Sequence, residues 1–106
     1  MDSNQNIIAT ANSGLTVQSP KDGYNEQNPQ EWVNATMECF ESLKLQKPIE
    51  FCECISIGIS GHMHGATLVD KNGEVIRPCI LWNDTRSHEE CIEFENQGID
   101  VRSISG

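Results

Sequence analysis

Hydrophobic and polar residues alternate in different patterns along the chain, and the first pattern is that of an extended segment. Residues 7–17 are rich in Ile, Ala, Thr and Val and are interrupted by Ser13-Gly14, which predicts an extended segment with a bend or bulge. Residues 19–28 contain Pro20, an Asp-Gly pair and several amide side chains, a composition typical of surface loops. We therefore expect the chain to begin with a strand followed by an exposed connection.

A helix is predicted directly after this loop. Asn28 can cap the helix, Pro29 suits its first turn, and Glu31 stands where a capping box requires an acidic residue. Apolar residues then recur at helical spacing and form one stripe, made of Trp32, Ala35 or Thr36, Cys39, Phe40 and Leu43. The helix should stop before Pro48, because proline lacks the backbone N–H that the helix needs.

The next segments have the period of two that is typical of strands. In residues 51–60 the large apolar side chains fall on one face and small residues on the other, with Phe51, Ile55, Ile57 and Ile59 on the large face. This pattern predicts a central strand in a sheet that is covered on both faces. Residues 66–70 and 74–82 flank Lys71-Asn72-Gly73 and predict a β-hairpin, because Asn-Gly between apolar runs favours a tight turn.

A second helix is predicted near the end of the chain. Ser87 and Glu90 form a capping box, apolar residues follow at Cys91, Ile92 and Phe94, and Gly98 is a stop signal. The expected order is therefore strand, helix, strand, hairpin and helix. This order predicts an α/β fold with a mixed sheet, a β-hairpin and flanking helices.

Length and charge narrow the classes of partner. A chain of 106 residues can bury one modest core, and its net charge of -9, from 16 acidic and 7 basic residues, repels nucleic acid and anionic membrane surfaces. The sequence contains neither a membrane-length apolar stretch nor the features of a signal peptide. Five cysteines without framework spacing suit reduced thiols. We therefore expect a cytoplasmic protein that binds neither nucleic acid nor membranes.

The segment with the most unusual chemistry is 58–65, where a predicted strand ends in three glycines around two imidazoles and a thioether. Glycines at a strand end let the backbone approach a ligand closely. A phosphate-binding loop is rejected, because no Lys and Ser or Thr follow in the required places. A metal site made of Cys52-x-Cys54 and His62-x-His64 is disfavoured, because the spacing is not that of zinc modules. A hydrogen-bonded structural role for either histidine remains open.

These residues resemble motifs of a known enzyme family. Two runs of the sequence are similar to the first domain of FGGY-family carbohydrate kinases. They are Ile59-Ser60-Gly61-His62-Met63-His64-Gly65 and Arg77-Pro78-Cys79-Ile80-Leu81-Trp82-Asn83-Asp84-Thr85-Arg86-Ser87. Within that family the closest likeness is to the xylulose kinases, whose pattern reads Gly-Gln-Met-His-Gly and then Arg-Pro-Ala-Ile-Leu-Trp-Asn-Asp. The run from Tyr24 to Trp32 also resembles the family's Glu-Gln-Asp-Pro-x-x-Trp helix start. The likeness covers nearly the whole chain, with its motifs in the family's order.

The resemblance implies a sugar-binding role for five residues. In the family the Met-His pair lines the sugar pocket, which assigns Met63 and His64 to that pocket, and the Leu-Trp-Asn-Asp run implicates Trp82, Asn83 and Asp84. Imidazole can hydrogen-bond sugar hydroxyls, while thioether and indole offer apolar surface to the C–H face of a sugar. For Asn83 and Asp84, the alternative to sugar contact is capping of the following helix. For Trp82, the alternative is a place in the hydrophobic core. The family usually has Gln where this chain has His62.

The resemblance also implies that parts of the family's machinery lie outside this sequence. By resemblance the chain is a partial N-terminal, sugar-binding domain of the ribonuclease-H-like, actin-like ATPase fold. The family's Asp-x-Gly-Thr phosphate loop, its catalytic aspartate and its nucleotide-binding domain do not occur here. We therefore expect no catalytic, metal-binding or MgATP-binding residue in this chain, and no kinase activity from it alone.

The implied reaction of a full-length parent is ATP-dependent phosphorylation of D-xylulose, a pentulose, to D-xylulose 5-phosphate. Sedoheptulose and gluconate kinases of the same family are alternatives, and so is a truncated sugar-binding or interaction module without activity. Residues 7–17 would then form an exposed sheet edge, which predicts weak self-association.

Overall fold

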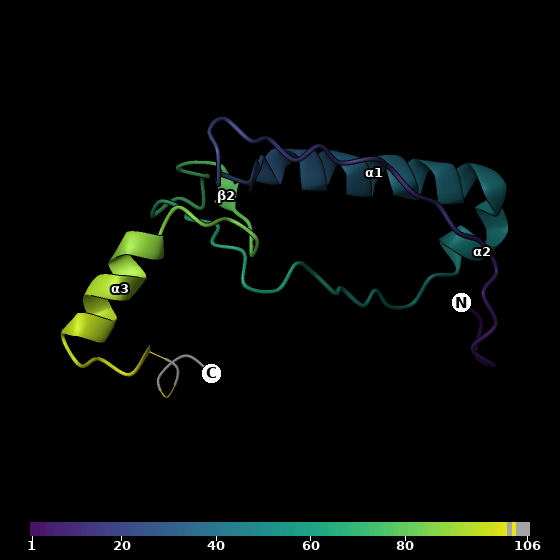
Figure 1. Cartoon of the computed structure of the whole chain (residues 1–106). Coiled ribbons are helices and arrows are strands. Elements are labelled where there is room, and N and C mark those ends of the chain that lie inside the picture. The colour runs from purple at the N-terminus through teal and green to yellow at the C-terminus, as the bar shows by residue number, and fades with distance from the viewer. Residues whose placement is uncertain (102, 104–106) are drawn as a thin grey trace.

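The longest element is helix α1, which spans Pro29–Gln46 in a computed structural model that describes residues 1–101 and 103 (Figure 1). Its predicted start is confirmed, because the Asn28 side-chain oxygen accepts a hydrogen bond of 3.0 Å from the Gln30 N–H. Its predicted end before Pro48 is confirmed as well. The apolar stripe that includes Trp32 and Leu43 is only half-buried, because no broad sheet lies against it in the described part of the chain.

The prediction of a central strand over residues 51–60 is wrong. The short helix α2 spans Pro48–Cys52 and so contains the first two of these residues. Pro48 both ends α1 and begins α2, because proline is favoured in the first turn of a helix. The Phe51 ring packs edge-on against Phe40 of α1, with 6.3 Å between the ring centroids. This contact uses an apolar side chain that the period-two pattern had assigned to a strand face.

The rest of the predicted central strand is irregular chain that runs back toward the other end of the molecule (Figure 1). Residues 54–60 have no strand partner among the described residues, and Ile55 and Ile59 are 99% and 92% exposed. Extended backbone becomes a stable strand only when neighbouring strands satisfy its hydrogen bonds and its apolar face is covered. Neither condition is met here.

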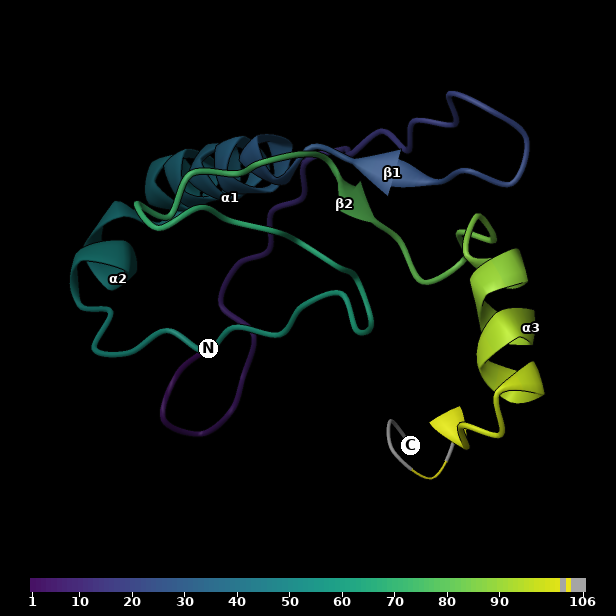
Figure 2. The same ribbon diagram turned by 90° about the vertical axis from the view of Figure 1, so that its left-hand side faces the viewer.

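A two-stranded antiparallel sheet joins the two halves of the sequence. Strand β1 is Glu26–Gln27 and strand β2 is Cys79–Ile80, with Glu26 opposite Ile80 and Gln27 opposite Cys79 (Figure 2). β1 lies inside residues 19–28, so the prediction that this whole stretch is a loop is wrong. Besides Pro29 at the start of α1, the buried apolar side chains of the described region belong to the β2 segment, where Cys79 is 0% and Leu81 6% exposed.

The hairpin predicted around Asn72-Gly73 is formed, although its pairing is sparse. Val69 bridges Val75, and the Asp70 N–H donates to the Glu74 carbonyl at 2.8 Å. Gly73 has a φ of 86°, a left-handed conformation that glycine adopts without strain. A second bridge joins Ala66 to Ile80. The two bridges are separated by three residues in the first arm, from Ala66 to Val69, and by five in the second, from Val75 to Ile80. The pairing between the arms is therefore irregular there.

Residues 7–17 lie along α1 and are irregular, so the strand predicted there is not formed (Figure 1). The Ser13 hydroxyl donates to Glu38 Oε2 at 2.6 Å, and the Gln46 side-chain amide donates to the Thr10 carbonyl at 3.1 Å. The bridge between Gln18 and Glu26 is the pairing found just beyond this stretch. The segment therefore covers a helix instead of forming a sheet edge.

The predicted second helix is confirmed as α3, His88–Asn96, which is followed by Gly98 with a φ of 75°. The Ile99 N–H donates to the Phe94 carbonyl at 3.0 Å, which is the Schellman arrangement at a helix end. The capping box at Ser87 is not formed, because the Ser87 side chain makes no capping hydrogen bond.

The arrangement of these elements is elongated. The Cα radius of gyration is 19.0 Å, against about 13 Å for a compact domain of about 100 residues. α1 with α2 lies toward one side and α3 toward the other, as Figures 1 and 2 show. The small sheet and the residues around it form the junction between these parts.

A network of charged side chains holds this junction together. The Asp84 carboxylate is 1% exposed and accepts hydrogen bonds from Arg86 Nη2 at 2.6 Å, Arg86 Nε at 2.8 Å and the Asn25 N–H at 2.7 Å. Arg86 Nη1 lies 2.7 Å from Glu26 Oε1, and Arg77 Nη2 lies 2.8 Å from the same oxygen. The network therefore connects β1 to both ends of the β2 segment.

The protonation equilibria reflect this pairing. The hydrogen bonds donated by Arg86 hold the pKa of Asp84 well below its usual value of 3.8, although burial acts in the opposite direction. The same bonds raise the pKa of Arg86 above its ordinary value, so this guanidinium stays charged. Its carbon also lies 3.9 Å from the centroid of the Tyr24 ring, which adds a cation–π contact from the loop before β1.

Removing the Asp84 charge should destabilise the junction. We expect Asp84→Asn to lower the free energy of unfolding by about 2 kcal/mol, because Arg86 then loses one of its two anionic partners in a mostly buried site. Urea denaturation followed by tryptophan fluorescence measures the change. Asp22→Asn, the same substitution in an exposed loop, is the matched control and should change stability by less than about 0.5 kcal/mol. Equal effects of the two substitutions would contradict a structural role for this network.

Acid should remove the same contribution. The folded-state pKa of Asp84 lies below its unfolded-state value, so the stability it adds is complete above the unfolded value of 3.8 and is lost as the pH falls toward the folded value. The difference in urea midpoint between the wild-type chain and Asp84→Asn should therefore be constant from about pH 7 to pH 5 and shrink below about pH 4. A difference that persists unchanged at about pH 2 would rule out this assignment.

Candidate functional site

The segment with the unusual sequence chemistry forms a turn at the edge of the small sheet. Met63 and His64 lie in this turn, and His64 has a φ of 62°, a left-handed conformation that is uncommon for a residue with a side chain. Directly after the turn, the Ala66 N–H donates to the Ile80 carbonyl at 3.0 Å, and the Ile80 N–H donates back at 3.3 Å. The sequence had predicted that the Met-His pair follows a strand. In the structure the pair instead precedes a bridge to β2.

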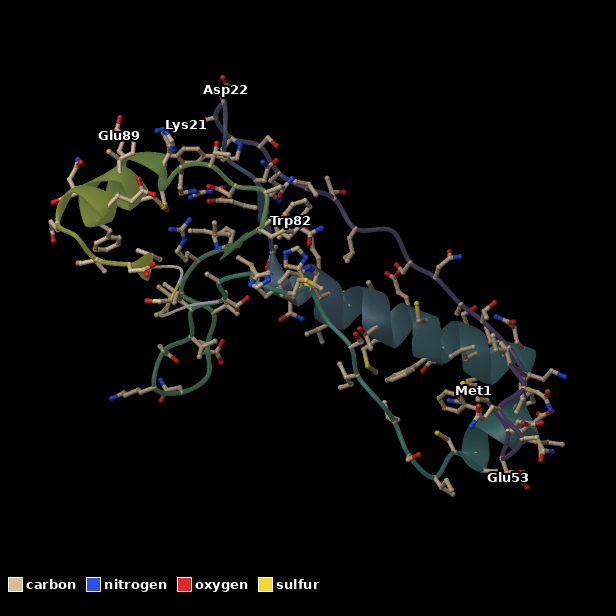
Figure 3. The ribbon with its side chains drawn as sticks, turned by 60° about the horizontal axis from the view of Figure 1, so that its bottom comes forward. Met1, Lys21, Asp22, Glu53, Trp82 and Glu89 are labelled. Atoms are coloured by element: carbon tan, nitrogen blue, oxygen red, sulfur yellow. The ribbon has the colours of Figure 1, made fainter. Side chains whose placement is uncertain are left out.

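Trp82 lies beside this turn. Its backbone N–H is 3.4 Å from Nε2 of His62 and donates a hydrogen bond to it. The side chains of Met63 and Trp82 are 72% and 69% exposed, and His64 is exposed as well. Trp82 therefore has no place in the core, and the structure brings three of the five predicted residues to one accessible region. Figure 3 shows Trp82 between α1 and the end of the molecule that carries Lys21, Asp22 and Glu89.

Asn83 and Asp84 have different surroundings. The Asn83 carbonyl accepts a hydrogen bond of 3.1 Å from the Asn25 side chain, while the Asn83 side chain is exposed. Asp84 faces the charged network, and its Oδ1 also accepts the Arg86 N–H at 2.9 Å. Because the Asp84 carboxylate is 1% exposed, its oxygens are not available to a ligand in this arrangement. The capping alternative raised from the sequence is not borne out either, because the N-cap of α3 is Ser87 and, among the described residues, the Asp84 carboxylate accepts hydrogen bonds only from Arg86 and Asn25.

Sequence reasoning missed the residues that fix this loop. Arg77, Arg86 and Glu26 were quoted as parts of motifs but received no role. One signal could have identified them: the chain has only 7 basic residues, and two of them lie within the ten residues from Arg77 to Arg86. In a chain with 16 acidic residues, such a pair favours a buried carboxylate nearby.

The described part of the chain offers hollows elsewhere but no metal cluster. A hollow of about 230 Å³ lies between residues 13–16 and α1, and one of about 500 Å³ is formed by residues of the loop 19–25. Neither is lined by Met63, His64 or Trp82. Among the described residues, no three His, Cys, Asp or Glu side chains gather as a metal ion would require. None of the described helices is long and apolar enough to cross a membrane.

Comparison with known proteins identifies the family. The model of the FGGY family of carbohydrate kinases, N-terminal domain, matches residues 1–106. The chain is 39% identical to the xylulose kinase of Klebsiella pneumoniae and 38% identical to that of Escherichia coli, over 94% of this chain in both cases. It spans about a fifth of the length of these curated relatives, 20% in each comparison.

Solved structures agree with the sequence comparison. A structure titled as a xyloylose kinase from Brucella ovis is 44% identical to this chain, with a TM-score of 0.87 over 92% of this chain and 21% of the solved one. A gluconate kinase from Lactobacillus acidophilus has a TM-score of 0.75 at 21% identity, which shows a likeness of fold alone. The chain, a small mixed α/β structure, therefore belongs to the FGGY family of carbohydrate kinases, in the part that forms their N-terminal domain.

Proposed function

We propose that this chain is the sugar-positioning part of an ATP-dependent carbohydrate kinase of the ribonuclease-H-like, actin-like fold, and that the acceptor sugar is D-xylulose. The observation that carries the proposal is the turn with Met63 and His64, which lies beside Trp82 and exposes all three side chains. Identities of 38–39% to curated xylulose kinases favour xylulose as the sugar. The proposed location is the cytoplasm.

The three exposed side chains offer complementary chemistry to a pentulose. An imidazole can both donate to and accept from hydroxyl groups, which suits His64 to a sugar O–H. The thioether of Met63 and the indole of Trp82 offer apolar surface to sugar C–H groups. The left-handed backbone of His64 is consistent with a functional constraint on the turn, because such a conformation costs about 1 kcal/mol and must be offset by its surroundings. Asn83 is a further proposed contact, whereas Asp84 holds the loop.

In a complete kinase the γ-phosphoryl group of MgATP moves to a sugar hydroxyl, the bond to the β,γ-bridging oxygen breaks, and the hydroxyl proton goes to a base. The described residues provide neither a phosphate cradle nor a group of acidic residues suited to Mg²⁺. MgATP therefore does not fit the described residues, and their proposed contribution to the transfer is positioning of the acceptor. We therefore expect the 106-residue chain alone to have no kinase activity.

Replacing the proposed sugar ligand should affect one substrate only. In a kinase that contains this chain, His64→Ala should raise KM for D-xylulose about tenfold, because one hydroxyl partner is lost, and leave KM for MgATP unchanged within about twofold. His88→Ala at the start of α3 is the control, since that imidazole is also exposed but lies on another element. Equal changes in the two KM values for His64→Ala would show a structural histidine.

Activity assays should separate the chain from a complete enzyme. ADP release from the 106-residue chain with MgATP should not rise above the sugar-free rate for D-xylulose, sedoheptulose, gluconate or glycerol. A complete kinase that contains the chain should release ADP fastest with D-xylulose. Sugar-dependent turnover by the chain alone would refute the proposal. A preference of the complete kinase for gluconate or sedoheptulose would show that D-xylulose is not its main substrate.

A further inference from the structure

His62 connects the turn that carries Met63 and His64 to Trp82. Its Nε2 accepts the Trp82 N–H at 3.4 Å, so this nitrogen carries the free lone pair and the imidazole proton must be on Nδ1. The next attachment of the turn is the bridge between Ala66 and Ile80. His62 thus extends the contact from Ile80 to Trp82, which is two residues further along the chain.

Gly65 provides the space in which the His62 ring lies. A Cβ atom at position 65 would stand 2.6 Å from Cδ2 of His62 and 3.0 Å from the Cys79 sulfur, which belongs to a fully buried residue. Gly65 does not have a positive φ, so the backbone conformation does not require glycine there. Gly61, at the other end of the same motif, would place a Cβ atom in open space. The requirement for glycine at position 65 therefore comes from the imidazole and the thiol beside it.

We propose that His62 is a positioning residue that holds Trp82 in register with the turn carrying Met63 and His64; this inference rests on the sugar-positioning function proposed above. The exposed His62 ring lies close to Gly65, and its one unprotonated nitrogen accepts the backbone N–H of Trp82. Sugar contact then depends on His62 through its neighbours, without His62 touching the sugar.

The chemistry required at position 62 is a planar side chain with a hydrogen-bond acceptor at a fixed reach. The Oε1 of a glutamine can accept the Trp82 N–H, as Nε2 of the histidine does, whereas a leucine of similar size cannot. His62→Gln and His62→Leu are therefore a matched pair of variants. Both remove the imidazole, but only His62→Gln keeps a hydrogen-bond acceptor.

The first experiment is independent of sugar. In ¹⁵N NMR spectra of the 106-residue chain at pH 7.5, a condition chosen to favour neutral imidazole, His62 should be the Nδ1–H tautomer. The Trp82 amide proton should be shifted downfield from its random-coil position, and it should stay so in His62→Gln but return toward random coil in His62→Leu. An Nε2–H tautomer, or a Trp82 amide at the random-coil position in the wild-type chain, would overturn the proposal.

The second experiment measures the consequence for the sugar. In a kinase that contains the chain, His62→Leu should raise KM for D-xylulose by about three- to tenfold with kcat changed less, and His62→Gln should recover most of that loss. Gly65→Ala should resemble His62→Leu because it displaces the imidazole, while Gly61→Ala should resemble the wild-type enzyme. Equal KM values for the Leu and Gln variants would overturn the positioning role. If D-xylulose is not a substrate, the proposed function fails, while the spectra still decide whether His62 holds Trp82.

Discussion

The structure depends on the charged network at the junction between its two halves. Apart from Pro29, Cys79 and Leu81, the described part of the chain buries no apolar side chain, so burial alone cannot hold β1 beside β2. Asp84 and Glu26 place their carboxylates around Arg86, and each is tied to a different segment of backbone. Because an Arg–carboxylate pair has fixed geometry, it specifies one arrangement where a small apolar contact would allow several. The turn beside Trp82 is positioned by the segment that this network fixes.

Most local signals in the sequence predicted local structure correctly, although the capping box at Ser87 is not formed. The Asn28 cap, the stop before Pro48, the turn at Gly73 and the left-handed Gly98 each depend on neighbours only a few residues away. Such signals act through the backbone preferences of single residues, so they remain valid whatever the rest of the chain does. The same reasoning missed α2, because Pro48 can both end one helix and begin another.

Strands were predicted less well, for a physical reason. A period of two indicates only which side chains would share a face, whereas a strand exists only when distant backbone pairs with it. Residues 54–60 have the pattern without a partner, and Glu26–Gln27 have a partner without the pattern. At the candidate site, the motifs predicted roles for Met63, His64 and Trp82, and the structure leaves all three exposed. The burial of Asp84, in contrast, follows from Arg86 and Asn25, and the distance to Asn25 could not be read from the sequence.

The exposed isoleucines of the unpaired segment have a consequence for the chain in solution. Ile55, Ile57 and Ile59 alternate along extended backbone with open hydrogen-bonding groups, which is the template on which intermolecular cross-β stacking grows. The opposing force is mutual repulsion between molecules that each carry a net charge of -9. Salt weakens that repulsion, since charges are screened over about 8 Å at physiological ionic strength. The colloidal stability of the chain is therefore set by its acidic surface, and it falls both with added salt and as the pH approaches the isoelectric point of about 4.6.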